Sequence, residues 1–238
     1  MTNLTTYIKN ELLCRGADLV GFGNLTELPP EVRQNLPIGI SVAVKYPKEV
    51  IKGIHVLPTK EYYEQYNALN IKLDMLVTLG AEILQMQGYQ AYAKTRAVVE
   101  QNETDYTTIL PHKTVATRAG LGWIGKSALL ITEQYGSMIR ISSVLTNAPL
   151  ETSSPVNSSK CSDCKICTNT CPANAIKGLN WSSEKKRDEI YDAKLCQAAA
   201  RQRAKKSFDI EITLCGKCIE VCPYTQRYLN SEQAAAPL

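Results

Sequence analysis

The chain has 238 residues, of which 44% are hydrophobic and 21% are charged, and its formal net charge is +4. This length and composition predict one or two globular domains with a substantial core. The charge excess is far below that of a typical nucleic-acid-binding domain, and no apolar stretch reaches the length of a membrane span. The first residues lack the basic and apolar regions of a signal peptide. We therefore expect a cytoplasmic protein that does not enter a membrane.

The first part of the chain predicts alternating helices and strands. Leu4, Ile8 and Leu12 recur every four positions, which indicates an amphipathic helix over residues 3–15. The aromatic residues of a second, long helix are expected in the core, with the wall of a cofactor site as the alternative. The elements expected after the first helix are, in chain order, strands at 17–22 and 38–46, the long helix at 59–87 and a strand at 90–95.

The middle of the chain predicts a loop, a helix and two strands. Residues 95–110 are polar and weakly patterned, so a loop is expected there. Residues 112–119 indicate a helix. Apolar, β-branched residues at 127–132 and 137–146 indicate a pair of strands joined through the turn at 133–136.

A change of composition indicates where one domain ends and another begins. The segment between the last predicted strand and the first cysteine run is rich in Ser, Pro and Asn, which is typical of a linker. In the second domain we expect a charged helix at 183–201 with Ser183 as its N-cap. The last eight residues are expected to be disordered. The predicted domains are an α+β domain at 1–150 and a cysteine-rich domain at 151–238.

Two cysteine runs dominate the second domain. The first, C-S-D-C-K-I-C-T-N-T-C-P, begins at Cys161, and the second, C-G-K-C-I-E-V-C-P, begins at Cys215. The spacing C-x2-C-x2-C-x3-C-P is that of bacterial ferredoxins, which hold 4Fe–4S clusters through thiolates. Zinc sites are less favoured because they do not prefer a triple run that ends in C-P. Disulfides are less favoured because they require an oxidising compartment, which nothing in the sequence indicates. The sequence therefore predicts a ferredoxin-like module that carries electrons.

Counting thiols indicates two clusters and one ligand outside the runs. Two 4Fe–4S clusters need eight thiolates, whereas the runs supply seven of the nine cysteines. Cys196 and Cys14 compete for the eighth place, and Cys196 is preferred because it lies between the runs. The fourth Cys of each run usually crosses to the other cluster. This predicts one cluster on Cys161, Cys164, Cys167 and Cys222, and another on Cys171, Cys196, Cys215 and Cys218.

A glycine-rich segment precedes the cysteine runs. Residues 120–127, G-L-G-W-I-G-K-S, satisfy the P-loop pattern G-x4-G-K-[S/T]. The segment before it does not look like a buried strand, and no strand that ends in a magnesium-binding Asp is evident, so an ATPase is disfavoured. Two alternatives remain. The loop is either a tight turn packed around Trp123 or a place where the backbone closely approaches a flat cofactor.

The segment R-A-G-L-G-W-I-G-K-S, followed by Y-G-S and by C-x2-C-x2-C-x3-C-P, resembles epoxyqueuosine reductases. These cobalamin-dependent iron–sulfur enzymes are related to reductive dehalogenases, and the resemblance runs from about Thr114 to Tyr228. It implies a nitroreductase-like mixed sheet with helices that binds cobalamin, followed by two 4Fe–4S clusters with Cys196 as a ligand. It also implies that the glycine loop and the next turn line the corrinoid site through Gly120, Leu121, Gly122, Trp123, Gly125, Lys126, Ser127, Gly136 and Ser137.

The family carries a catalytic Asp, thought to deliver a proton, in a D-T-x-P-like segment ahead of the glycine loop. The matching position here is Tyr106, with Asp105 one place away and the Pro absent. A one-residue bulge would restore Asp105 as the general acid, and a loop aspartate without a catalytic role is the alternative. His112 is a second candidate proton donor, with a surface histidine as its alternative.

The resemblance implies a reductase in which two clusters deliver electrons to a cobalamin in the first domain. The electrons would come from a low-potential donor such as ferredoxin or flavodoxin, and the substrate would be a small or corrinoid-bound molecule. A tRNA substrate is doubtful because the family's C-terminal helical extension is not seen in this sequence. The alternatives are a two-cluster electron carrier without a substrate site and an FMN-dependent reductase of the same fold.

Overall fold

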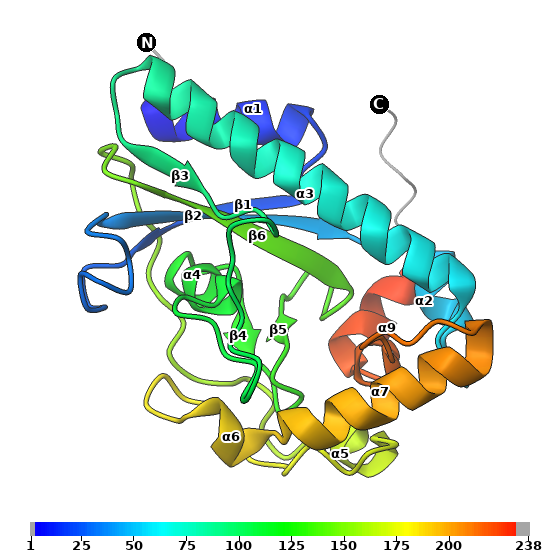
Figure 1. The fold of residues 1–238 in the computed structure, drawn as a ribbon. Coiled ribbons are helices and arrows are strands. Elements are labelled where there is room, and N and C mark those ends of the chain that lie inside the picture. The colour runs from blue at the N-terminus through cyan, green and yellow to red at the C-terminus, as the bar shows by residue number, and fades with distance from the viewer. Residues whose placement is uncertain (1–2, 232–238) are drawn as a thin grey trace.

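A four-stranded sheet forms the centre of the first part of the chain (Figure 1). The structure is a computed structural model that describes residues 3–231. The strand order is β1-β2-β6-β3, and every neighbouring pair is antiparallel. The prediction of a mixed sheet is therefore wrong, since parallel pairing is confined to an isolated bridge between Gly23 and Ser153. The strands are β1 (Leu19–Asn24), β2 (Ile38–Lys45), β3 (Ala91–Ala93) and β6 (Ile139–Thr146).

The sheet is covered by helices on both faces. Helices α1 (Leu4–Cys14) and α3 (Lys60–Met86) cover one face, and α4 (His112–Arg118) covers the other (Figure 1). Burial on two faces explains why six consecutive residues of β2 are inaccessible and why its sequence is apolar and β-branched. The predicted helices α1, α3 and α4 and the predicted strands β1, β2, β3 and β6 are therefore confirmed.

The two predicted strands around the turn at 133–136 do not pair with each other. Strand β5 (Leu130–Ile131) pairs with β4 (Trp123–Ile124) in a separate two-stranded sheet, whereas β6 joins the main sheet. Only a bridge between Thr132 and Gly136 remains of the expected hairpin. The reason lies at Gly122, where a Cβ would stand 2.0 Å from the carbonyl oxygen of Ile131. The missing side chain lets the glycine-rich segment displace β6 as the partner of β5.

The predicted helix at 183–201 is broken in the structure. A single turn, α6 (Arg187–Ile190), is followed by extended backbone at Tyr191, which forms a β-bridge with Ile176. Helix α7 (Ala193–Phe208) then begins with Asp192 as its N-cap, whose carboxylate accepts a hydrogen bond of 2.9 Å from the amide of Leu195. Ser183 is therefore not the cap, because the bridge at Tyr191 interrupts the helix before it can form as one piece.

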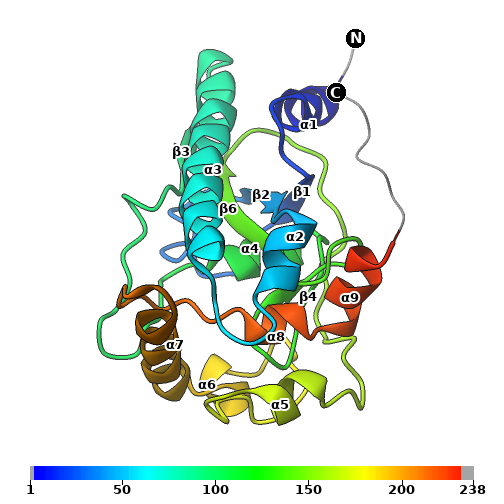
Figure 2. The same ribbon diagram turned by 90° about the vertical axis from the view of Figure 1, so that its right-hand side faces the viewer.

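The cysteine-rich part packs against the N-terminal end of α3 and lies below the sheet in these views (Figures 1 and 2). Leu214 and Leu229 are buried in the same hydrophobic cluster as β2 and α3, so the two parts share a core. The boundary at residue 150 stays a prediction. The remaining helices are α2 (Lys48–Gly53), which the sequence did not predict, α5 (Ile166–Thr170), α8 (Lys217–Glu220) and α9 (Pro223–Leu229).

The predicted disordered tail lies outside the described residues except for Ser231. Within residues 3–231, no helix is long and apolar enough to cross a membrane.

The position of the cap of α7 can be tested by two alanine substitutions. Asp192→Ala should lower the free energy of unfolding by about 0.5–2 kcal/mol, because the amide of Leu195 loses its partner. Ser183→Ala, at the predicted cap, should change it by less than about 0.5 kcal/mol. Urea unfolding followed by far-UV circular dichroism measures both. An equal loss in the two variants would contradict this start of the helix.

Candidate functional site

The cysteines of the two runs gather around two cavities. One cavity of about 210 Å³ is lined by a first group, Cys161, Cys164, Cys167 and Cys222, and is also touched by Cys218. A second cavity of about 370 Å³ is lined by a second group, Cys171, Cys196, Cys215 and Cys218. The members of each predicted ligand set thus lie together, including the crossed cysteines and Cys196.

Cys14 lies away from both groups. It is exposed and ends α1, across the sheet from the cysteine-rich part (Figure 1).

The local backbone explains how each run turns its thiols inward. In the first run the amide of Cys164 donates to the carbonyl of Cys161 at 3.0 Å, and α5 then carries the chain on to Cys171. In the second run Gly216 has a left-handed φ of +75°, and a Cβ there would stand 2.4 Å from Ile54. Only glycine satisfies both constraints without strain. Pro223 then starts α9, so that Cys222 stays at the helix entrance.

Burial and mutual repulsion disfavour free thiolates at both groups. Burial, followed by the nearby Cys161, Cys222 and Cys164, raises the pKa of Cys167 to about 11. Burial also raises the pKa of Cys218, followed by the repulsion from thiolates at Cys196, Cys215 and Cys167. A cationic metal centre would reverse this effect, because it stabilises thiolates.

The thiols surround cavities and not a single point. Among residues 3–231, no three His, Cys, Asp or Glu side chains converge closely enough to hold one metal ion. Four thiolates at about 2.3 Å from one zinc would lie roughly 3.8 Å apart. The wider arrangement around a cavity fits a cube of four irons and four sulfides, with one thiolate for each iron.

The glycine-rich loop packs against the first cysteine group. Trp123 is 1% exposed and meets the ring of Tyr224 edge-on at 4.8 Å. The Lys126 ammonium donates to the carbonyl of Cys164 at 2.9 Å. At Gly125 a Cβ would stand 2.3 Å from Ile131 and 3.5 Å from the sulfur of Cys161. These residues therefore hold the strand pair β4–β5 against the thiols.

The remaining glycines of the predicted corrinoid site also face protein. Gly120, with φ +69°, faces Ser153 and Ser154, and a Cβ at Gly136 would stand 2.2 Å from the amide of Thr225. The partly buried Leu121 packs on Gly21. Contact between these residues and a corrinoid stays a prediction.

Ser127 and Ser137 differ from the glycines because they line the second cavity beside the cysteines. The amide of Ser137 donates to the hydroxyl of Thr225 at 3.1 Å, which fixes its position. Its own hydroxyl is buried without a hydrogen-bond partner in the part of the chain that the structure describes. An orphaned hydroxyl aimed at a cavity fits a polar-edged ligand. Tyr46 also lines this cavity, together with Tyr62 and Tyr66 of α3, so the aromatic stripe of α3 serves both the core and the cavity.

A larger cavity of about 630 Å³ adjoins the second cysteine group. It lies between α4, β6, the loop at 95–110 and the segment at 181–190. Lys113, Arg140 and Ile141 line both this cavity and the one beside the cysteines, so the two are neighbours. Sequence reasoning missed Lys113 and Arg140. The only signal was an arginine inside the apolar strand β6.

His112 and Lys113 begin α4 and line the large cavity. The Nδ1 atom of His112 lies 2.9 Å from the hydroxyl of Ser143. Burial, and then the charges of Arg140 and Lys94, lower the pKa of His112 to about 4. The imidazole is therefore neutral at pH 7 and is not a surface histidine. Burial, and then Arg187, lower the pKa of Lys113 to about 8, and its ammonium donates to the carbonyl of Ala128 at 2.7 Å.

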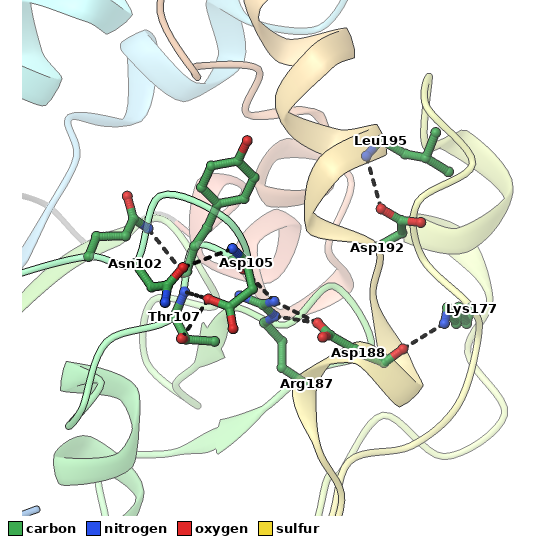
Figure 3. A network of polar contacts seen from close by, with 10 residues as sticks. Asn102, Asp105, Thr107, Lys177, Arg187, Asp188, Asp192 and Leu195 are labelled. Atoms are coloured by element: carbon green, nitrogen blue, oxygen red, sulfur yellow. Dashed lines mark hydrogen bonds and ion pairs between the residues drawn. The ribbon is translucent and has the colours of Figure 1, made fainter.

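Asp105 lies outside the large cavity in a network of polar contacts (Figure 3). Its carboxylate accepts hydrogen bonds from the amide and the hydroxyl of Thr107, at 2.9 and 2.7 Å, and its carbonyl accepts one from Arg187. The bonds from Thr107 lower the pKa of Asp105. The neighbouring Tyr106 lines the cavity instead. Asp105 therefore does not reach the cavity in this conformation of the loop.

Comparison with known proteins supports the cysteine assignment at the level of the module. Residues 160–225 match the model of a 4Fe–4S double cluster binding domain, which confirms the expected cluster chemistry. The chain is also similar to an epoxyqueuosine reductase from Listeria monocytogenes, at 33% identity over 119 residues. That match covers 47% of this chain and 29% of the relative. The predicted resemblance is thus confirmed, although the chain spans less than a third of this relative.

Two kinds of solved structure share the fold. One is a reductive dehalogenase whose structure suggests a mechanism for B12-dependent dehalogenation, with TM-score 0.70, 18% identity and coverage of 91% of this chain and 31% of that chain. The other is an epoxyqueuosine reductase with an epoxyqueuosine-modified tRNA stem loop, with TM-score 0.61, 19% identity and coverage of 94% and 65%. The likeness in fold therefore extends over nearly the whole chain.

The buried neutral His112 predicts a pH dependence of stability. Its folded-state pKa of about 4 lies below the ordinary 6.5, so its contribution to stability is present above pH 6.5 and is lost as the pH falls toward 4. Lowering the pH from 7.5 to 5.5 should therefore reduce the free energy of unfolding of the wild type by about 1.4 kcal/mol through this residue. His112→Asn removes the titration and keeps a polar group for Ser143. Urea unfolding at both pH values should show a smaller loss in the variant, and equal losses would contradict the buried neutral imidazole.

Proposed function

We propose that this protein is an iron–sulfur reductase that passes electrons through two 4Fe–4S clusters to a substrate bound between its sheet and its cysteine-rich part. The observation that carries the proposal is the second cysteine group, which lines a cavity next to the large one. The similarity to epoxyqueuosine reductases and the double cluster domain match support the same chemistry. We also propose that the front domain is nitroreductase-like and that the domains divide at residue 150.

The first cluster is held by Cys161, Cys164, Cys167 and Cys222, and the second by Cys171, Cys196, Cys215 and Cys218. Exposed residues such as Asp163 and Lys194 flank both groups. The second group lines the cavity that adjoins the large one, so it lies nearer to the proposed substrate site. Cys218 of the second group also lines the cavity of the first group, so the groups are neighbours. Electrons from a small low-potential donor such as ferredoxin or flavodoxin enter at the first cluster and reach the second.

A cobalamin is proposed to lie over the second cluster, in the space that the cluster leaves in its own cavity and in the adjoining cavity of about 630 Å³. The residues that fit it are the orphaned hydroxyl of Ser137, the neighbouring Ser127 and the tyrosine wall of Tyr46 and Tyr62. When bound, cobalamin would supply a low-valent cobalt centre as the reductant. The chain itself orients the cofactor, excludes water and delivers low-potential electrons from the all-thiolate cluster.

Protons come from groups that line the large cavity. Lys113 is charged at pH 7 and lies between the two cavities, and Tyr106 offers a phenol. Asp105 serves as the general acid only if the loop at 95–110 turns its carboxylate toward the cavity. Such a rearrangement has to break the bonds of Asp105 to Thr107 and Arg187.

The expectation that tRNA is a doubtful substrate is withdrawn. That expectation rested on where the printed sequence ends, which does not bear on what the cavity accepts. A structure of similar fold holds a modified tRNA stem loop, so a tRNA and a small molecule both remain open as substrates.

Cofactor analysis of the anaerobically purified protein tests the proposal. About eight irons per chain, together with a corrinoid absorption spectrum after reconstitution with cobalamin, are expected. Eight irons without any organic cofactor would point to an electron carrier, and a bound FMN would point to a flavin-dependent reductase. Either result would contradict the cobalamin part of the proposal.

The eighth ligand can be tested by a matched pair of substitutions. Cys196→Ala should lower the iron content from about eight to about four per chain, because the second cluster loses one of its four thiolates. Cys14→Ala should leave iron unchanged, since Cys14 is exposed on α1. Iron analysis and the visible absorption of reconstituted protein measure both. Unchanged iron in Cys196→Ala, or a loss in Cys14→Ala, would contradict the assignment.

A further inference from the structure

The large cavity has a strongly one-sided charge. Its lining contains the side chains of Lys113, Arg118, Arg140, Lys185 and Arg187 and no carboxylate of the described residues. Burying cations without counter-ions is costly, and clefts lined by charge of one sign concentrate ions of the opposite sign. The cavity therefore has the electrostatic character of an anion site.

Three of these cations have no carboxylate partner within 4 Å among residues 3–231. Arg140 stacks 4.4 Å from the ring of Tyr66 and donates only to the side-chain oxygen of Asn70. Lys113 and Lys185 donate only to backbone carbonyls, those of Ala128 and Asn180. These bonds fix the positions of the side chains and leave their charges uncompensated.

The other two cations are only partly compensated. Arg187 pairs with Asp188 (Figure 3), whose side chain is 69% exposed and does not line the cavity. Arg118 is 8% exposed and pairs with Glu27, whose side chain is 68% exposed. The Nε–H of Arg118 is buried and has no hydrogen-bond partner among the residues that the structure describes, which leaves a donor of a buried guanidinium to be satisfied.

The lining also has an apolar side. Leu28, Ile124, Ile141 and Trp181 line the same cavity, and Trp181 is 8% exposed. A volume of about 630 Å³ lies within the range of small-molecule sites. The ligand therefore has an apolar or aromatic body in addition to its charged group.

We propose that the large cavity binds an organic anion whose phosphate or carboxylate group supplies the missing counter-charge of Arg140 and Lys113. The position of this anion next to the second cluster is the one part of the inference that rests on the proposed function. The oxyanion has two possible sources, the substrate itself or the phosphodiester in the nucleotide tail of a cobalamin. Both sources use the same chemistry, and a guanidinium is well suited to it.

The test is an anaerobic calorimetric titration of the reconstituted protein with inorganic pyrophosphate at pH 7. We expect saturable binding that is at least tenfold weaker in Arg140→Gln and in Lys185→Gln. The second variant guards against misfolding, because Lys185 is exposed whereas Arg140 packs on Tyr66. The control is Lys9→Gln, which removes one exposed cation from α1 on the other side of the sheet. It should bind like the wild type.

Competition identifies the source of the anion. If cobalamin displaces pyrophosphate and cobinamide, which lacks the phosphodiester, does not, the cavity holds the cofactor's phosphate. If pyrophosphate still binds to the cobalamin-loaded protein, the cavity holds the substrate's anion. Both outcomes support the site. Absence of saturable binding, or equal weakening in Lys9→Gln, would overturn it. The titration does not depend on electron transfer. If pyrophosphate does not bind to a protein that holds eight irons and cobalamin, the anion site is wrong and the proposed function still stands.

Discussion

The fold of the cysteine-rich part depends on one constraint, which is that each cavity draws thiols from segments far apart in the chain. The first group joins the first run to Cys222, and the second joins Cys171 to Cys196 and the second run. The chain between the two runs must therefore lead away from the cavities and come back to them. Helix α7 lies on this path, with Asp192 as its N-cap and Cys196 in its second turn. Loop closure of this length costs conformational entropy. Forming thiolates there without a metal centre would add to that cost, because burial and the neighbouring thiolates raise the pKa of Cys218.

The front domain is also positioned by the thiol groups, because its glycine turns pack against the cysteine-rich part. Gly136 lets the turn before β6 approach Thr225 of α9, and Gly125 brings β5 against Cys161. Because these contacts leave no room for side chains, the sheet and the thiols are held in one arrangement. The arrangement leaves cavities between them, and Arg140 of β6 and Lys113 of α4 reach these cavities from the sheet side. Under the proposed function, electron delivery and ligand binding therefore meet at one place.

Some of this could be predicted from the sequence because the signals are local. The periodicity of α1 and α3 and the β-branched strands β1, β2 and β6 follow from burial on one or two faces. The two ligand sets followed from short spacers, which leave few geometries for a cluster. Other features depend on tertiary contacts. The partner of β5 is decided by the close approach at Gly122, and the start of α7 by the bridge between Ile176 and Tyr191. Lys113 and Arg140 come from separate elements, so no pattern along the chain indicated that they share a cavity.

The central claim is that two neighbouring clusters form one electron path toward the cavities. Electron paramagnetic resonance of the reduced, reconstituted protein tests it most directly. Because Cys218 of the second group lines the cavity of the first group, the two paramagnetic clusters are close and should give a spectrum broadened by their magnetic interaction. In Cys196→Ala that interaction should vanish and leave the simple signal of one cluster. A single isolated signal from the fully reduced wild type, with iron near four per chain, would contradict the account.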